Sequence, residues 1–387
     1  MPAPCGVRTL GGWIRSTAYA RMPEFPGFLK WDEAGPTIDV FLVSIPDRAP
    51  LRSADLSGRQ RATRTKAARP RPGGLGTFRH PADFAMLAPM KIDFTAPVGP
   101  KKFLRARRDE LAAMRFTRIS VEQLGATLGA EIAGVDLRRP LDDETFAEIQ
   151  RALLAFKVLF FRDQDLSPAE HAAFGRRFGE LEIHPFLPSP EGCPEVVLLA
   201  KNESIGGYEN GWHSDVTWRV APSLGSILRC REGPVVGGDT LFADMAAAYQ
   251  GLPGQVREQI DGLRAVHDFT ITFGRMLSPE DLAAKQKEYP AVSHPIVRTH
   301  PATGEKVLFV NRGFTSHVEG FEADESRRLL AYLYQQASYP EYQVRFRWRK
   351  NSIAFWDNRS TQHYASSDYW PQVRVMERVT VVGDRPY

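Results

Sequence analysis

The sequence predicts a mainly β fold, a β-sandwich or jelly roll with helices packed outside it. Many short runs of β-branched and aromatic residues alternate with turn residues, whereas few stretches have the periodicity of a helix. The sequence shows neither a repeat at a solenoid period nor a glycine-rich phosphate loop. With 43% hydrophobic and 25% charged residues among 387, the composition is that of a globular protein. No run reaches the roughly 18 apolar residues of a transmembrane helix, so we expect no membrane partner.

Residues 1–113 differ in composition from the rest of the chain. They hold 19 Lys+Arg against 10 Asp+Glu and 13 of the 29 prolines, whereas residues 114–387 hold 31 basic and 36 acidic residues. A basic, Pro/Arg-rich segment buries too little apolar surface to offset its ordering entropy. We therefore expect a poorly ordered extension, which a start codon placed too far upstream would explain, with Met90 or Met114 as the true start. A transit peptide and a nucleic-acid contact are the alternatives for this segment. For the protein as a whole we expect no nucleic-acid partner, because residues 114–387 lack a positive stripe.

Ordered elements are predicted in turn from residue 114 to residue 387. Residues 130–137 alternate and predict a strand, residues 143–156 have one apolar helical face, and residues 157–162 predict a buried strand. A helix begins at Ser167, because Ser-Pro-Ala-Glu combines an N-cap serine, a proline at the first helical position and a capping-box glutamate. A later helix is expected at residues 322–337. The later strands are expected at residues 196–199, 223–231, 296–298, 307–310, 342–348, 353–356 and 373–382.

The first candidate site is the motif WHSD, residues 212–215. In an extended strand, residues i and i+2 point to the same face, so His213 and Asp215 can present an imidazole and a carboxylate to one metal ion. Taken alone, such a pair is more often a surface histidine beside an aspartate than a metal site.

A second cluster completes a set of metal ligands. His363 ends the motif WDNRSTQH, and Arg374 and Arg378 follow it on the next predicted strand. Two histidines and one carboxylate match the facial triad of non-haem iron(II) oxygenases, which leaves one face of the metal open. A nearby arginine is expected where a dicarboxylate cosubstrate is held by a bidentate, charge-assisted fork. A zinc hydrolase and a non-catalytic jelly-roll binding protein are the alternatives from other classes.

These motifs resemble those of the iron(II)- and 2-oxoglutarate-dependent dioxygenases of the taurine dioxygenase type, the TauD/TfdA family. The resemblance covers roughly residues 115–387, and it implies a double-stranded β-helix (jelly-roll) core of the clavaminate synthase-like kind for a domain at residues 114–387. The motifs that carry it are WHSDVTW (212–218), GGDTLF (237–242), NRGFT (311–315), WDNRSTQHYA (356–365) and RVMERVTVVGD (374–384).

The resemblance implies a role for individual residues. His213, Asp215 and His363 are similar to the catalytic iron ligands, and Thr240 and Arg374 are similar to the groups that grip the far carboxylate of 2-oxoglutarate. The remaining residues would bind the substrate: Arg378 as its anion anchor, His184 as the polar partner of that anchor, Phe314 and Thr272 as pocket wall, and Leu187 and Glu209, where the family's taurine dioxygenases carry Tyr and Asn.

The resemblance also implies a reaction and its cofactors. The cofactors are Fe(II), 2-oxoglutarate as cosubstrate and O2. The reaction is the hydroxylation of a small anionic substrate in sulfur metabolism. The first expectation is a sulfonate such as taurine, which would give an aldehyde and sulfite. An alkylsulfatase or an aryloxyalkanoate dioxygenase of the same family is the alternative. We expect a homo-oligomer, a dimer or tetramer. Three cysteines cannot form a disulfide framework, so we expect a cytoplasmic location.

Overall fold

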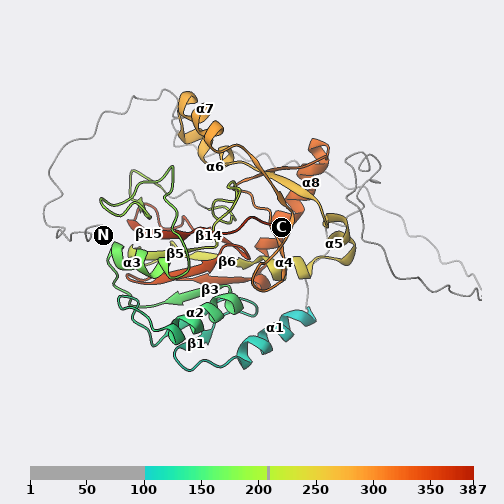
Figure 1. The fold of residues 1–387 in the computed structure, drawn as a ribbon. Helices are drawn as coiled ribbons and strands as arrows, with labels where there is room; N and C mark the ends of the chain where they lie inside the picture. Colours follow the sequence, from blue (N-terminus) through green and yellow to red (C-terminus); the bar gives the residue numbers. More distant parts are fainter. Residues whose placement is uncertain (1–100, 207–209) are drawn as a thin grey trace, which may run out of the picture. The chain divides into compact units, whose positions relative to one another are not determined.

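The computed structural model describes residues 101–206 and 210–387, and these form a mainly β structure with helices around it (Figure 1). Most of the segment predicted as a poorly ordered extension lies outside the described residues, as does Glu209. Helix α1, Lys102–Ala113, precedes the boundary that the sequence predicts at residue 114. Its Leu111 is buried in the core, and Arg107 donates a hydrogen bond to the carbonyl of Ala155 at 2.7 Å.

The largest sheet has seven strands in the order β1-β2-β3-β13-β5-β15-β4. All its neighbours pair antiparallel except β2 and β3, which are parallel and are connected through helix α2. This crossover follows from the geometry of parallel pairs, which a tight turn cannot join. The strand bounds are β1 Ser120–Gln123, β2 Ala130–Ala133, β3 Val158–Phe161, β13 Ile353–Asp357, β5 Gly225–Glu232, β15 Arg374–Val381 and β4 Val196–Lys201.

Three smaller antiparallel sheets complete the β structure of the described residues. The sheet β12-β6-β14 packs against the large sheet, and its strands are β12 Gln343–Phe346, β6 Thr240–Asp244 and β14 Thr361–Ala365. The others are β11-β7-β8, with β11 Thr315–Val318, β7 Arg264–His267 and β8 Val292–Pro295, and β10-β9, with β10 Lys306–Leu308 and β9 Val297–Thr299.

Helices α2 and α3 begin where the sequence places strong caps. Helix α2, Asp143–Phe156, is capped by Asp142, whose side chain accepts from the Thr145 N–H. Helix α3, Pro168–Arg176, has the predicted capping box between Ser167 and Glu170. The other helices are α4 Met245–Gly251, α5 Gly254–Ile260, α6 Thr270–Phe273, α7 Pro279–Glu288 and α8 Ala323–Gln335, with short 3₁₀ turns at η2 Gly274–Met276, η3 Gln336–Ser338 and η4 Pro340–Tyr342. Within the described ranges, no helix has the length and apolar character needed to cross a bilayer.

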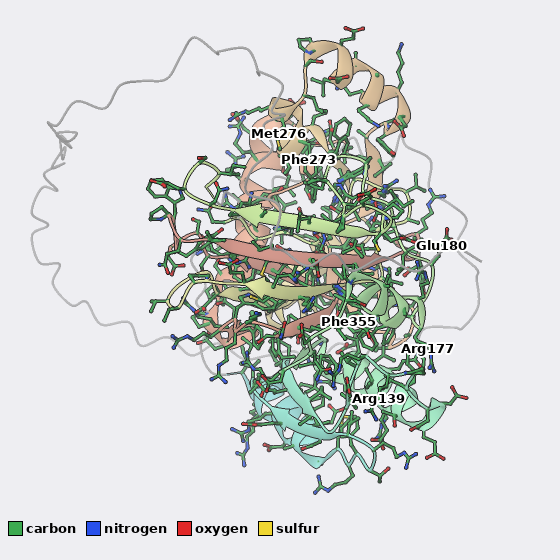
Figure 2. The ribbon with its side chains drawn as sticks, turned by 90° about the vertical axis from the view of Figure 1, so that its left-hand side faces the viewer. Arg139, Arg177, Glu180, Phe273, Met276 and Phe355 are labelled. Atoms are coloured by element: carbon green, nitrogen blue, oxygen red, sulfur yellow. The ribbon has the colours of Figure 1, made fainter. Side chains whose placement is uncertain are left out.

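On the large sheet the core forms two layers, because strand residues alternate between its two faces. One face packs on the sheet β12-β6-β14, where Phe160 stacks on Phe346 with ring centroids 4.1 Å apart. The other face packs on α2 and α3, where Phe355, labelled in Figure 2, contacts Phe174 of α3 and Phe178 just after that helix. Each fully buried aromatic side chain contributes about 1.5–3 kcal/mol to folding.

Strand β15 shows how this alternation positions functional groups. Val379 and Val381 pack with Ala172 of α3 on the helix side. Met376 lies in the layer between the sheets, so Arg374 and Arg378, two residues to either side, share its face. The fold thus directs both candidate arginines into the space between the sheets.

Most of the predicted elements are confirmed, with ends shifted by a few residues. The strands at 353–356 and 373–382 appear as β13 and β15, and the helix at 322–337 appears as α8. The strands that were not predicted are β1, β6, β7, β8, β11 and β14. Each is only four or five residues long, which is too short to give a clear period.

Candidate active site

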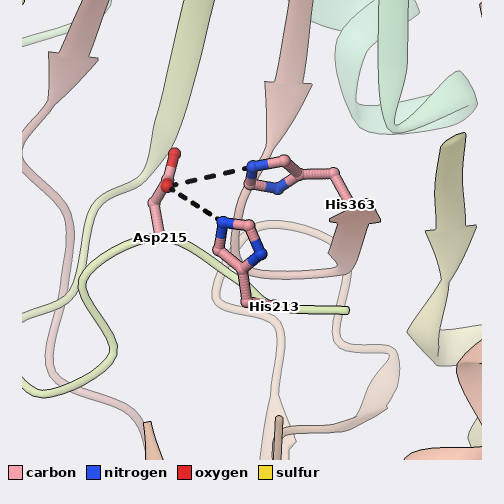
Figure 3. Close-up of side chains that lie close together, drawn as sticks. All are labelled: His213, Asp215 and His363. Carbon is pink, nitrogen blue, oxygen red and sulfur yellow. Dashed lines mark ion pairs between the residues drawn. The ribbon is translucent and has the colours of Figure 1, made fainter. Parts of the chain in front are cut away.

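His213, Asp215 and His363 come together between the two packed sheets (Figure 3). His363 lies in the middle of β14, and His213 forms an isolated antiparallel bridge with it. The two residues exchange backbone hydrogen bonds of 3.1 and 2.8 Å. The prediction that His213 and Asp215 share one extended strand is wrong: only His213 pairs, and the chain turns at Asp215. Nevertheless, the turn brings the carboxylate to the same point as the imidazole.

The distances fit a single ion. Nε2 of His213 and Nε2 of His363 each lie 3.9 Å from Oδ1 of Asp215. All three ligand atoms lie within 4.8 Å of one another. Two bonds to a metal at about 2.1 Å span up to about 4.2 Å, so small side-chain movements let one ion contact all three. Elsewhere in the described part of the chain, no other group of three such side chains is close enough for a metal.

The surroundings of the imidazoles direct one nitrogen of each toward this point. Nδ1 of His213 lies 2.8 Å from the carbonyl oxygen of Gly211, which can only accept, so Nδ1 carries the proton and Nε2 keeps its lone pair. His363 is buried beside Trp356 and Phe242. Burial, together with the nearby His213 imidazole, lowers the pKa of His363 to about 3 despite the opposing charge of Asp215. The ring is therefore neutral, as a metal ligand must be.

Asp215 is held as an anion. Burial alone would raise its pKa, but the Arg378 guanidinium, the two imidazoles and the Ser226 hydroxyl outweigh burial and hold the pKa below its ordinary value. Ser226 donates to Oδ2 at 2.7 Å, and Nη1 of Arg378 donates to Oδ1 at 2.8 Å. Both partners belong to the large sheet, so the sheet fixes the rotamer of the carboxylate.

The backbone of Asp215 is clamped by Asn358, in the turn between β13 and β14. The Asn358 side chain accepts from the Asp215 N–H at 2.7 Å and donates to the Asp215 carbonyl at 2.9 Å. Ser214 adds a bond of 2.7 Å to the carbonyl of Thr361. The next residue, Val216, has a φ of 47°, which is costly for a β-branched side chain and persists only where neighbours fix it. The segment that carries His213 and Asp215 is thus joined to strand β14, which carries His363.

The turn that carries Asn358 is itself fixed by a buried ion cluster. Arg359 binds Asp357 through two bonds of 2.9 and 2.6 Å, and Nε2 of His300 lies 3.0 Å from the same carboxylate. Burial opposes the charge of Asp357, but Arg359 and His300 hold its pKa below the ordinary range. Asn358 is therefore held between this ion cluster and the backbone of Asp215.

We predict that Asn358→Ala weakens metal binding about tenfold, because loss of a group that orients a ligand typically costs 10–100-fold in metal affinity. The substitution leaves the buried N–H and carbonyl of Asp215 without this partner. Titration of the metal-free protein with Co(II), followed by visible absorption, measures the affinity. Asn202→Ala, in an exposed loop, is the control. An unchanged Co(II) affinity in Asn358→Ala would contradict the clamp.

The candidate cosubstrate residues lie on the two facing sheets. Thr240 begins β6, and its hydroxyl accepts from the indole N–H of Trp348 at 2.9 Å, which leaves the hydroxyl proton free to be donated. Arg374 begins β15 and is buried, with its guanidinium 5.8 Å from the ring centroid of Tyr369. A Cβ at Gly238, two residues before Thr240, would lie 3.5 Å from Cδ of Arg374. The start of β6 and the start of β15 are therefore neighbours.

Two of the candidate substrate residues, His184 and Phe314, both contact the ring of Phe273. His184 is buried, and burial and the nearby Arg378 lower its pKa to about 3. Its Nδ1 accepts from the Phe186 N–H at 3.2 Å, so Nε2 of the neutral ring is the donor.

The proposed pocket wall is close to the candidate metal ligands. The ring of Phe314 lies 6.4 Å from that of His213 and stacks at 6.2 Å on Phe273, which Figure 2 labels on α6. Thr272 is exposed and donates to the carbonyl of Gly313 at 2.6 Å. Leu187 is half-buried.

Sequence reasoning missed the residues that hold the site residues in place. Ser226, Trp348 and Asn358 each bind one candidate functional group directly. Asn358 lies within the motif WDNRSTQHYA, directly after a buried strand, and this position could have indicated a role in holding the site. Ser226 and Trp348 belong to strands whose partners only the fold reveals.

The sequence model described as "Taurine catabolism dioxygenase TauD, TfdA family" matches residues 120–380. The chain belongs to the TauD/TfdA family. It is 38% identical over 276 residues to an α-ketoglutarate-dependent sulfate ester dioxygenase of Pseudomonas putida, a match that covers 69% of this chain and 91% of that protein. It is also 34% identical over 274 residues to the α-ketoglutarate-dependent 2,4-dichlorophenoxyacetate dioxygenase of Cupriavidus pinatubonensis, covering 66% and 94%.

Solved structures support the same membership. The crystal structure of a taurine dioxygenase from Burkholderia xenovorans superposes with a TM-score of 0.61 at 40% identity, covering 70% of this chain and 93% of that one. The TauD/TfdA protein described here is thus an α-ketoglutarate-dependent (2-oxoglutarate-dependent) dioxygenase.

Proposed function

We propose that this TauD/TfdA protein uses Fe(II) and 2-oxoglutarate to hydroxylate a small organic sulfonate or sulfate ester at the carbon that bears the sulfur-containing group. The observation that carries the proposal is the direct contact between Arg378 and Asp215. It places a buried cation, the expected partner of a substrate anion, beside the candidate metal site. Residues 114–387 would form the catalytic domain, with a double-stranded β-helix core of the clavaminate synthase-like kind. The antiparallel pairing of the two packed sheets supports this core.

The donor set fits iron. Two imidazoles and one carboxylate that converge on one point match the ligands of the facial triad, which leaves positions for a chelating cosubstrate and for O2. Zinc takes the same ligand types, so a zinc hydrolase is separated by its failure to consume 2-oxoglutarate. His213, Asp215 and His363 would hold the iron. When bound, the iron and 2-oxoglutarate would together supply the oxidising power, and 2-oxoglutarate would be oxidatively decarboxylated to succinate and CO2.

The side chains of this chain supply binding and orientation. Arg374 would bind the far carboxylate of 2-oxoglutarate, and Thr240, oriented by Trp348, would donate its hydroxyl proton to the same group. Asp215 stays ionised because Ser226 and Arg378 bind its two oxygens. The site is thereby organised before the substrate arrives, which lowers the cost of reaching the reactive arrangement.

Arg378 and His184 would bind the anionic group of the substrate. Arg378 is buried, and its Nε has no hydrogen-bond partner among the described residues. His184 is neutral, with a donor at Nε2, so it can bind an anion without adding charge. Phe314 and Thr272 would form the wall beside His213, and Leu187 would line the pocket. Glu209, if it faces the pocket, would favour a substrate with a cationic or donor group.

The overall reaction balances without further reagents. One oxygen atom of O2 enters succinate and the other becomes the hydroxyl on the target carbon. A carbon that bears both a hydroxyl and a sulfonate expels sulfite and leaves an aldehyde. The corresponding sulfate ester expels sulfate instead. An aryloxyacetate would release a phenol and glyoxylate, and it remains the alternative substrate.

The test is a substrate panel assayed with the iron-loaded protein and 2-oxoglutarate. Taurine, plain alkyl sulfonates, alkyl sulfates and aryloxyacetates are compared by succinate, sulfite and sulfate release. We predict that alkyl sulfonates or alkyl sulfates give the highest kcat/KM, with taurine lower, because Leu187 cannot supply the hydrogen bond of the tyrosine in taurine dioxygenases. Succinate formation that no sulfur oxyanion stimulates would refute the substrate assignment.

A further inference from the structure

Asn311 begins the motif NRGFT, in which the resemblance assigns a role to Phe314 alone. It is buried, and both ends of its side-chain amide are bonded. Oδ1 accepts from the Phe314 N–H at 3.0 Å, and this contact fixes the orientation of the amide because a backbone N–H can only donate. Nδ2 therefore donates to Oγ1 of Thr217 at 3.0 Å. The amide thus joins the turn that carries a candidate wall residue to the turn that follows Asp215.

Thr217 extends this connection to strand β7. Its side chain is fully buried, so its hydroxyl proton needs an acceptor. Nδ1 of His267, at the end of β7, lies 2.9 Å from this hydroxyl oxygen. Burial and the nearby His294 hold the pKa of His267 well below its ordinary value, so the ring is neutral and Nδ1 can accept. A directional chain of hydrogen bonds therefore runs from Phe314 through Asn311 and Thr217 to His267.

The turn that begins at Asn311 also packs directly on a candidate metal ligand. A Cβ at Gly313 would lie only 3.1 Å from Cβ of His213, so this position leaves little space for a side chain. The Phe314 ring that follows lies 6.4 Å from the His213 ring. At the other end of the chain of hydrogen bonds, Thr217 directly follows Val216, whose positive φ persists only where neighbours fix it. The hydrogen bonds therefore connect the wall of the pocket to the segment that carries two candidate ligands.

We propose that Asn311 is a positioning residue that holds Phe314, and with it the target carbon of the substrate, at the correct distance from the metal site. This inference rests on the proposed function and goes beyond it by naming the group that places the pocket wall. Buried polar networks whose members are all satisfied rigidify the groups that they contain. A displacement of about 1 Å in the reacting arrangement can lower a rate about a hundredfold. Loss of the Asn311 amide should therefore separate the consumption of 2-oxoglutarate from the hydroxylation of the substrate.

The test measures coupling, which is the ratio of sulfur oxyanion released to succinate formed. The iron-loaded full-length protein is assayed with 2-oxoglutarate and, in parallel, with hexyl sulfate and hexanesulfonate. Ascorbate supplies the two electrons that reduce the second oxygen atom of O2 to water in a turnover without hydroxylation. We expect Asn311→Ala to lower kcat/KM for the sulfur oxyanion at least about tenfold and to lower the coupling ratio below that of the wild type. A loss of folded protein alone leaves this ratio unchanged.

Two substitutions of Thr217 isolate the contribution of its hydroxyl. Thr217→Val keeps the shape of the side chain but removes the hydroxyl, and it should lower the coupling ratio as Asn311→Ala does. Thr217→Ser keeps the hydroxyl and should retain most of the wild-type ratio. Thr117→Val, at an exposed threonine before β1, is the matched control. If Asn311→Ala does not fold, Thr217→Val decides the proposal.

Two binding measurements separate the pocket wall from the metal and cosubstrate sites. In Asn311→Ala, the Co(II) affinity from visible absorption should stay unchanged, as should calorimetric binding of 2-oxoglutarate to the Mn(II)-loaded protein. Weaker binding of either would show that the amide acts on those sites and not on the wall. A wild-type coupling ratio in Asn311→Ala or Thr217→Val, or equal ratios in Thr217→Ser and Thr217→Val, would also overturn the proposal. Failure of the proposed function is seen separately, because the wild-type protein would then release no sulfur oxyanion.

Discussion

The substitution His363→Ala is expected to abolish iron-dependent turnover of 2-oxoglutarate, with a loss of at least about a hundredfold. Loss of a group that merely orients a metal ligand costs 10–100-fold, and removing one of three ligands costs more. The same result is expected for His213→Ala and for Asp215→Ala. In Asp215→Ala, the buried Arg378 also loses its carboxylate partner. Succinate release and bound iron are measured together on the purified variants.

The control for this prediction is His317→Ala, an exposed histidine in β11 outside the site. It should keep both activity and iron content. Circular dichroism separates loss of the metal from loss of the fold. Near-normal turnover and iron content in any one of the three site variants would show that the His–Asp–His assignment is wrong.

The second large effect is expected for Arg374→Ala, which should raise the KM for 2-oxoglutarate by about a hundredfold or more. Each charge-assisted hydrogen bond to a carboxylate contributes about 1.5–3 kcal/mol, and a bidentate guanidinium makes two. Arg374→Lys should recover part of the loss, because it keeps the charge but not the fork. Initial rates over a range of 2-oxoglutarate concentrations, at saturating substrate, measure the effect.

Arg349→Ala is the matched control, since Arg349 is exposed in the turn before β13. It should leave the KM for 2-oxoglutarate unchanged. A fall in kcat with an unchanged KM for 2-oxoglutarate in Arg374→Ala would place this arginine outside the cosubstrate site.

Local sequence signals predicted the elements that are longest or best capped. Helix α3 follows from Ser167, its proline and Glu170, because a capping box satisfies backbone donors within the segment itself. Helix α2 and strand β13 follow from the apolar pattern. Strands of four residues, such as β7 and β11, give no period, and their pairing depends on partners distant in the chain.

The sequence by itself determined the chemical identity of the candidate site. The residue types and order of His213, Asp215, His363 and Arg374, together with the resemblance of their motifs to the TauD/TfdA family, predict a metal-binding dioxygenase. The local geometry predicted at Asp215 was wrong. The carboxylate reaches its position through a turn clamped by Asn358, and not through an extended strand.

Only the tertiary structure decided which side chains support and extend the site. Asn358 reaches Asp215 across 143 residues, and Arg378 reaches the same residue across 163 residues. Such contacts depend on strand register, which is set by burial over the whole sheet and not by neighbouring residues. A motif can therefore indicate the ligands of a site, whereas the orientation of those ligands is fixed only when distant strands pack.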